Sequence, residues 1–147
     1  MPKNKTKQLI KVVLDTNILV SSLMCTKGNP SKILTLVRMN KLQPYYNAEI
    51  MNEYNRVLHY PRLRIMPQEI SVIVNLILRK GITMEAEKSI VKMPDETDRI
   101  FYDLHKAAGA ILITGNAKHY PTENSIMNPA DFMKYYNDIS VKNPDLN

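Results

Sequence analysis

The sequence has few of the features that mark secreted or membrane-bound proteins. It contains a single cysteine, Cys25, which cannot form a disulfide within the chain and is typical of a reducing cytoplasm. Its position beside Met24 favours a small buried side chain over a reactive one. No long apolar segment precedes Asp15, so we expect neither a secretory signal nor a membrane anchor. These absences favour a cytoplasmic protein.

The sequence also lacks internal repeats and low-complexity tracts. Its 147 residues are enough for one domain with a hydrophobic core and few for two. A hydrophobic content of 44% and a charged content of 23% are typical of a globular protein. We predict a basic flexible arm over residues 1–8, a single domain over residues 9–137 and a polar tail over residues 138–147.

The charge balance is basic. The formal net charge is +6 and the pI is about 9.4. This excess favours an anionic partner such as RNA or DNA, although lysine that serves only solubility gives the same balance.

Apolar runs alternate with amphipathic segments along the chain. We expect strands at residues 9–14, 42–46, 82–84, 90–93, 110–114 and 125–127. We expect helices at residues 18–24, 31–38, 47–59, 67–80, 97–108 and 129–136. Ser31, Asn47 and Thr97 are the expected N-caps, and Pro44 indicates an edge or an end of its strand. The alternation predicts an α/β sandwich with a mostly parallel sheet.

Polar residues follow two of the buried strands directly. Asp15-Thr16-Asn17 follows an apolar run, and residues 114–119 follow another. A third polar group, residues 95–98, immediately precedes a helix. Because the carboxyl ends of parallel strands meet at one edge of a sheet, we expect these three segments to lie together. Carboxylates that converge on a basic protein indicate a divalent cation that acts on a phosphate.

Asp15, Glu53 and Asp98 are the candidate ligands, and each has an ordinary structural alternative. Asp15 at a strand-to-helix junction is also suited to cap the helix. Glu53 is placed to form an ion pair with Arg56 one helical turn on. Asp98 is placed to stabilise a helix N-terminus through its dipole. The role of Asp95, in the same acidic loop, stays open.

Four short motifs resemble the PIN domain family. They are Val12 to Ser21, Glu53 to Leu58 with Pro61-Arg62-Leu63, Asp98 to Phe101, and Leu112 to Asn116 with Lys118-His119. Together they span residues 11–136 and most resemble the branch of toxin components of toxin–antitoxin pairs, relatives of the VapC-type toxins.

The resemblance implies a metal-dependent endoribonuclease that uses Mg²⁺ or Mn²⁺. It implies a three-layer α/β/α sandwich around a central, mostly parallel sheet of about five strands. By motif position, Asp15, Glu53 and Asp98 match the family's catalytic and metal-binding acids. Asn116 lies where many members have a fourth aspartate, which weakens the case for a second tightly held ion.

The resemblance also implies contacts to substrate and to other proteins. The polar positions that match substrate-binding or supporting positions are Thr16, Asn17, Thr114 and Asn116. Lys118 and His119 are placed to contact a phosphate, with a solvated loop pair as the alternative. The expected partners are RNA, a small antitoxin protein, and a second copy of the chain that docks on the helices at residues 31–38 or 67–79.

Two other functions compete with this interpretation. A phosphatase of the haloacid dehalogenase type also begins with a strand and an aspartate, but it needs a second aspartate where this chain has Asn17. A PIN-like module that binds RNA or protein without cleaving it is favoured by Asn116. It is disfavoured by Asp15, Glu53 and Asp98, since clustered carboxylates without a cation repel one another.

Overall fold

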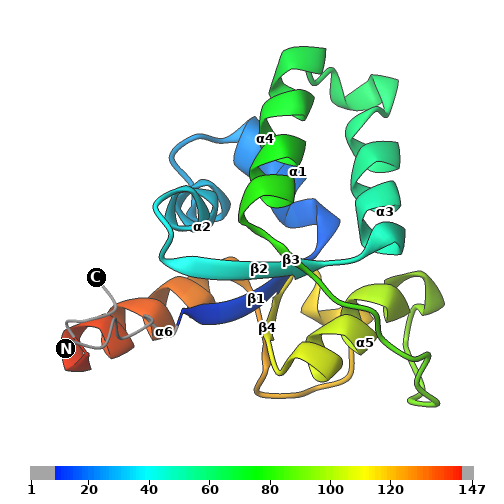
Figure 1. The fold of residues 1–147 in the computed structure, drawn as a ribbon, viewed down its shortest axis with the longest axis vertical. Coiled ribbons are helices and arrows are strands. Elements are labelled where there is room, and N and C mark those ends of the chain that lie inside the picture. Colours follow the sequence, from blue (N-terminus) through cyan, green and yellow to red (C-terminus); the bar gives the residue numbers. More distant parts are fainter. Residues whose placement is uncertain (1–8, 144–147) are drawn as a thin grey trace, which may run out of the picture.

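The computed structural model describes residues 9–143, and the expected basic arm at residues 1–8 lies outside this range. Five parallel strands form the central sheet, in the order β3-β2-β1-β4-β5 (Figure 1). The strands are β1 (Ile10–Leu14), β2 (Leu42–Tyr46), β3 (Ile82–Thr83), β4 (Ile111–Ile113) and β5 (Ile126–Met127). The expected α/β/α sandwich with a parallel sheet is confirmed.

Six helices cover the sheet. They are α1 (Thr16–Met24), α2 (Asn29–Arg38), α3 (Ala48–Leu58), α4 (Pro67–Lys80), α5 (Arg99–Ala108) and α6 (Pro129–Lys142). Helices α1 to α4 lie on one side of the sheet, α5 lies on the other, and α6 packs beside α2 (Figure 1). None of the helices within residues 9–143 is long and apolar enough to cross a membrane.

The core forms where the helices place apolar side chains against the sheet. Val12, Val13 and Leu14 of β1 are buried, and Tyr54 of α3 reaches the ring of Phe101 in α5 at a centroid distance of 6.2 Å. Burial of each such side chain stabilises the fold by about 1.5–3 kcal/mol. The last three residues of β1, which lead to Asp15, are therefore part of the core.

Two glycines are required by the backbone. A Cβ on Gly81 would lie 2.5 Å from the carbonyl oxygen of Ile77 and 2.7 Å from the ring of Tyr46, so α4 ends against β2 only with glycine there. Gly109 ends α5 with a φ of 63°, a left-handed conformation that glycine adopts without strain.

Pro44 lies inside the sheet, although we expected an edge or an end. Tyr46 accepts a hydrogen bond from the backbone of Met84 on the β3 side, and alternate residues of a strand face the same neighbour. Pro44 therefore also faces β3, where pairing starts only at Tyr45. The missing N–H of the proline costs no ladder hydrogen bond.

The N-caps differ from expectation in two of three helices. Asn47 caps α3 as predicted, since its side chain accepts a hydrogen bond from the backbone of Ile50. Helix α2 begins earlier than Ser31, after Gly28, because proline is tolerated in the first turn of a helix. Before α5, Asp95 rather than Thr97 provides the capping side chain, and a short 3-10 turn at Glu96–Asp98 precedes the helix.

Three further expectations were wrong. Residues 90–93 form no strand: the side chain of Arg99 donates to the backbone carbonyl groups of Ser89 and Val91, and Ile90 is fully exposed. Helix α6 continues beyond Tyr136 to Lys142, so most of the expected polar tail that the structure describes is helical. Cys25 is exposed because it follows the last turn of α1.

Candidate functional site

Asp15 lies at the carboxyl end of β1, between that strand and α1. Its backbone N–H donates to the carbonyl oxygen of Ile113, which places β4 beside it. Its carboxylate oxygen Oδ2 accepts hydrogen bonds from Thr114 Oγ1 at 2.8 Å and from the Tyr120 hydroxyl at 2.9 Å. Burial raises the pKa of Asp15, and the hydrogen bonds from Thr114 and Tyr120 oppose that rise. Asp15 is thus a buried carboxylate that its neighbours hold in one orientation.

Asp98 lies at the start of α5, close enough to Asp15 for the two charges to interact. Burial, followed by the negative charges of Asp15 and Asp95, raises the pKa of Asp98 to about 6, and His119 opposes this rise. Nδ1 of His119 lies 3.2 Å from Asp98 Oδ2 and 3.9 Å from Asp95 Oδ2. The fold therefore concentrates negative charge at the sheet edge and leaves it only partly neutralised.

The acidic loop offers a donor set that fits a divalent cation. One ligand atom from each of Asp95, Asp98 and His119 lies within 4.8 Å of the other two. Oδ2 of Asp98 is buried and receives no well-aligned hydrogen bond from the residues that the structure describes. A buried carboxylate oxygen whose neighbour is an imidazole at 3.2 Å is better satisfied by a bound cation. Two carboxylates and an imidazole suit Mn²⁺ at least as well as Mg²⁺, because Mg²⁺ prefers oxygen ligands.

Glu53 does not belong to this group of side chains. Nη2 of Arg56 lies 2.8 Å from Oε1 and 2.7 Å from Oε2 of Glu53. This is the ion pair with Arg56 that the sequence offered as the structural alternative for Glu53. Its neighbour on α3, Tyr54, is fully buried and donates to the carbonyl oxygen of Leu14 at 2.6 Å. Helix α3 is thereby attached to the residue that precedes Asp15, while the carboxylate of Glu53 is bound to arginine.

The polar turns beside Asp15 are connected to each other. Oδ1 of Asn17 accepts a hydrogen bond from the backbone of Gly115 at 2.9 Å, and Oγ1 of Thr114 accepts one from the backbone of Asn116 at 3.0 Å. A Cβ on Gly115 would lie 3.3 Å from Asn17 Oδ1, so this turn is tight. Asn17 and Thr114 therefore fix the shape of the site.

The remaining predicted substrate-binding residues differ in exposure. Oγ1 of Thr16 is buried and has no hydrogen-bond partner among the described residues. Asn116 and Lys118 are exposed, and the side chain of Lys118 forms no hydrogen bond or ion pair within residues 9–143. His119 is half exposed and pairs with the acidic loop instead. Both Lys118 and Asn116 are available to a ligand at this edge.

The sequence did not predict the contacts of two residues of the site, Tyr120 and Asp95. Tyr120 is buried, and burial, followed by the charge of Asp15, raises the pKa of its hydroxyl, which keeps it a donor. A tyrosine between His119 and Pro121 gives no pattern that distinguishes it from an ordinary core residue. Asp95 gave a partial signal, since it lies in the acidic loop, but only the fold brings it near His119.

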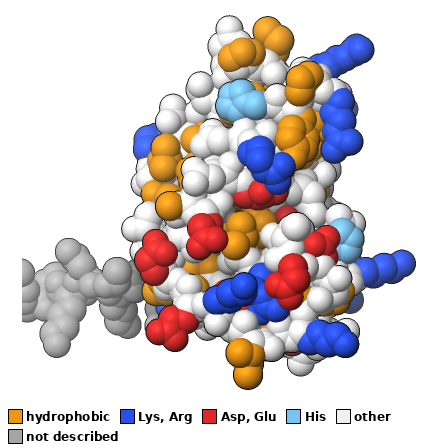
Figure 2. All heavy atoms as spheres, turned by 90° about the vertical axis from the view of Figure 1, so that its right-hand side faces the viewer, with side chains coloured by type: hydrophobic (Ala, Val, Ile, Leu, Met, Phe, Trp, Pro, Cys, Tyr) orange, Lys and Arg blue, Asp and Glu red, His pale blue; other side chains and the backbone are white. Residues whose placement is uncertain are grey.

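Acidic side chains gather on the face formed by α3 and α5. Figure 2 views this face, with acidic groups across its middle and Lys and Arg side chains above and below them. Acidic and basic groups therefore lie close together on this face.

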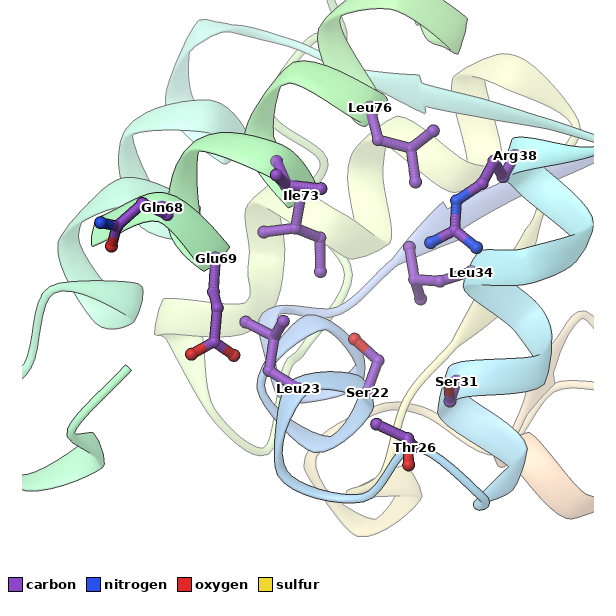
Figure 3. A pocket seen from close by; sticks show the side chains of 11 residues that line it. Ser22, Leu23, Thr26, Ser31, Leu34, Arg38, Gln68, Glu69, Ile73 and Leu76 are labelled. Carbon is purple, nitrogen blue, oxygen red and sulfur yellow. The ribbon is translucent and has the colours of Figure 1, made fainter. Parts of the chain in front are cut away.

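A separate apolar cavity of about 340 Å³ lies among α1, α2 and α4. Leu34, Ile73 and Leu76 line it, and Arg38 and Glu69 lie on opposite sides of it (Figure 3). None of the predicted site residues lines this cavity. It is not part of the acidic site.

Comparison with known proteins identifies the family of this chain. Residues 11–118 match the model of the PIN domain. The chain is also 34% identical over 116 residues to the uncharacterized protein MJ1680 of Methanocaldococcus jannaschii, a match that covers 73% of this chain and 71% of that protein. Asp15, Glu53, Asp98 and Asn116 all lie within the residues matched to the PIN domain model. The chain belongs to the PIN domain family.

Proposed function

We propose that this protein is a metal-dependent endoribonuclease that hydrolyses RNA phosphodiester bonds. PIN domains are generally metal-dependent nucleases that commonly act on RNA. The observation that carries the proposal is the buried Oδ2 of Asp98, which lies among the charges of Asp15 and Asp95 and is only partly compensated by the imidazole of His119, 3.2 Å away. Such an arrangement is unfavourable in a metal-free protein and favourable around a cation.

In this proposal, Asp15 and Asp98 hold the cation, with Asp95 or His119 beside them. The cation would supply a Lewis acid for the phosphate and lower the pKa of a water molecule that attacks it. Thr114 and Tyr120 keep Oδ2 of Asp15 occupied as an acceptor, so the carboxylate cannot rotate freely. The residues of the chain thus orient the ligands before substrate arrives.

Glu53 keeps its proposed role as a third acid under one condition. Its carboxylate must exchange Arg56 for the cation. Breaking this ion pair costs little free energy, because the pair is partly exposed on α3. The released Arg56 would then be available to a phosphate of the substrate. Lys118 and Asn116, exposed at the same edge, are the other proposed substrate contacts.

Cleavage of RNA tests this function directly. A structured RNA pool should be cleaved by the purified protein in Mn²⁺ or Mg²⁺ and remain intact in EDTA. Asp15→Asn should lower the rate by more than about 100-fold, since loss of a supporting residue alone typically costs 10- to 100-fold. Asp138→Asn, an exposed change on α6, should leave the rate unchanged.

Undiminished cleavage by Asp15→Asn would remove the catalytic assignment. Binding of RNA without cleavage in any metal would instead favour a PIN-like binding module, the alternative that Asn116 supports.

We propose further that the protein acts in the cytoplasm as a toxin that a small antitoxin restrains. The proposal rests on the motif resemblance and on the exposed acidic groups, among which a cationic side chain of a partner would fit. Induced expression should slow bacterial growth, and co-expression of the product of a neighbouring gene should restore it. Normal growth despite active protein would argue for a housekeeping nuclease.

Self-association through α2 and α4 is the last part of the proposal. Both helices line the apolar cavity, and Val72 of α4 is 65% exposed. Sedimentation should detect a dimer, and Val72→Glu should convert it to a monomer. A monomeric wild-type protein would exclude this interface.

A further inference from the structure

A cluster of cations lies at the end of α3 that follows Glu53. The cluster consists of three arginines, Arg56, Arg62 and Arg64, together with Tyr60. No carboxylate occurs between Tyr54 and Met66. The guanidinium carbons of Arg56 and Arg62 each lie 5.5 Å from the centroid of the Tyr60 ring. Arg56 also donates a hydrogen bond to the Tyr60 hydroxyl. One aromatic ring therefore orients two guanidinium groups.

The positive charge of this arginine cluster is poorly compensated. Arg56 pairs with Glu53, but Arg62 and Arg64 form no ion pair within the described part of the chain, and both are exposed. Cations that share one ring repel each other unless an anion lies between or above them. Arg64 has a φ of 53°, a conformation in which arginine is disfavoured relative to glycine or asparagine. Local backbone preference thus does not account for an arginine there.

Helix α3 connects this cluster to the acidic site, because Tyr54, the residue after Glu53, donates a hydrogen bond to the carbonyl oxygen of Leu14, which precedes Asp15. Glu53 and Arg56 are one helical turn apart, about 4.5 Å along the axis, and the guanidinium of Arg56 contacts both Glu53 and Tyr60. The α3 end of the face in Figure 2 carries Lys and Arg side chains above the acidic groups. A polyanion that reaches the acidic site would therefore lie over this cluster.

We propose that the arginine cluster binds the phosphates of the RNA strand that flank the cleaved bond, with Tyr60 as the residue that positions the arginines. This inference rests on the proposed nuclease function. Carboxylates at a cleavage site repel RNA, so most of the binding energy must come from cations beside it. Guanidinium forks match the paired oxygens of a phosphate, and a strand offers such groups in series.

Binding of a fluorescent single-stranded RNA in EDTA isolates this inference from catalysis. By anisotropy, Arg62→Ala should weaken binding roughly 5- to 10-fold and reduce the slope of log K against log salt by about 0.7. The RNA affinity of Arg62→Lys should lie between those of the wild type and Arg62→Ala, because lysine keeps the charge but lacks the guanidinium fork. Tyr60→Leu, which keeps all three arginines, should weaken binding roughly 3-fold.

Arg79→Ala is the matched control. Arg79 is exposed near the end of α4 and outside the cluster, so its loss removes the same charge and should change binding by less than about twofold. Melting curves of each variant show that it is folded.

Several outcomes would overturn the inference. Wild-type affinity in Arg62→Ala would do so, as would an equal loss in Arg79→Ala, which would mean that only net charge matters. Displacement of RNA by polyglutamate of equal charge, with the same dependence on Arg62, would assign the surface to an acidic protein instead.

Cleavage in Mn²⁺ is measured separately, so the two proposals can fail independently. If the protein cleaves RNA but Arg62→Ala binds RNA as tightly as the wild type, only the proposal for the arginine cluster is refuted. Binding that depends on Arg62 without cleavage in any metal would refute only the nuclease and would support the cluster.

Discussion

Asp98 illustrates, at the scale of single residues, how the fold stores unfavourable charge. The side chain is only 16% exposed, and burial, together with the charges of Asp15 and Asp95, raises its pKa to about 6. An ordinary aspartate has a pKa of 3.8. The folded protein therefore binds this proton more tightly than the unfolded chain, and its free energy of unfolding falls as pH rises from about 4 to 6.

The first prediction concerns Asp98→Asn in EDTA. Because the variant carries no charge at this position, it should be more stable than the wild type at pH 7, by about 1 kcal/mol after solvent screening is allowed for. Below pH 4 the difference should disappear, since Asp98 is then protonated. Urea unfolding at both pH values measures this, with Asp138→Asn as the control. A variant less stable at pH 7 would contradict the charge argument.

The second prediction concerns the hydroxyl of Tyr120. Tyr120→Phe leaves the ring in place but removes one donor to the buried carboxylate of Asp15, so the free energy of unfolding at pH 7 should fall by about 1–3 kcal/mol. Tyr135→Phe, at a partly exposed ring on α6, should have little effect. Chemical unfolding of both variants tests this, and equal stability of Tyr120→Phe and wild type would show that the hydrogen bond does not matter.

At the scale of elements, the segment between β3 and α5 is ordered by side chains rather than by a strand. Arg99 donates to the carbonyl oxygen and hydroxyl of Ser89 at 2.9 Å and to the carbonyl oxygen of Val91 at 2.6 Å. The carboxylate of Asp103 accepts a hydrogen bond from the backbone of Ser89. One helix face thus holds the chain that leads to Asp95.

The third prediction follows from this attachment. Arg99→Leu should loosen residues 85–95, so trypsin should cleave after Lys88 or Lys92 faster than in the wild type, and stability should fall by about 1.5–3 kcal/mol. Mass spectrometry identifies the fragments. Arg79→Leu also removes a charge and a trypsin site, but elsewhere, and should not change the rate of cleavage after Lys88 or Lys92. Unchanged protection in Arg99→Leu would mean that packing of Met93 alone orders the segment.

A second element, the loop between β4 and β5, is attached in a similar way. Glu123 accepts hydrogen bonds from the Tyr102 hydroxyl and from Lys106 of α5, and the imidazole of buried His105 lies 3.1 Å from the Ser125 hydroxyl. Burial lowers the pKa of His105, which keeps its imidazole neutral. The loop that carries His119 and Tyr120 is thereby held against α5.

At the scale of the whole molecule, a basic protein brings several of its carboxylates together at one edge of the sheet. The net charge of +6 coexists with carboxylates that gather at the sheet edge. Long-range attraction brings an anionic substrate to the surface, and a cation at the acidic site would reduce the local repulsion between the carboxylates and the substrate. Metal binding should therefore be linked to the stability of the entire domain.

The fourth prediction is that Mn²⁺ stabilises the protein. A concentration 100-fold above the dissociation constant adds about 2.7 kcal/mol, and each kcal/mol raises Tm by about 2–4 °C in a domain of this size. EDTA should reverse the shift, and Asp98→Asn should abolish it. Binding should also weaken as pH falls through about 6, because protons compete for Asp98. An identical shift in Asp98→Asn would place the ion elsewhere.

The sequence alone determined the features that depend on local order. The apolar run of β1 predicted a buried strand that ends at Asp15, the pattern of α3 predicted its cap at Asn47, and the alternation of elements predicted a parallel sheet with its polar turns at one edge. Each of these follows from the periodicity and backbone preference of neighbouring residues.

Only the tertiary structure decided which side chains meet. Tyr120 donates to Asp15 across 105 positions of sequence, His119 lies beside Asp98, and Arg99 excludes the expected strand at residues 90–93. The sequence offered Glu53 either a cation or Arg56 as its partner. In the structure it pairs with Arg56, because the two residues lie one turn apart on α3. Such contacts depend on how distant segments pack and on the balance of burial against charge, which no local pattern contains.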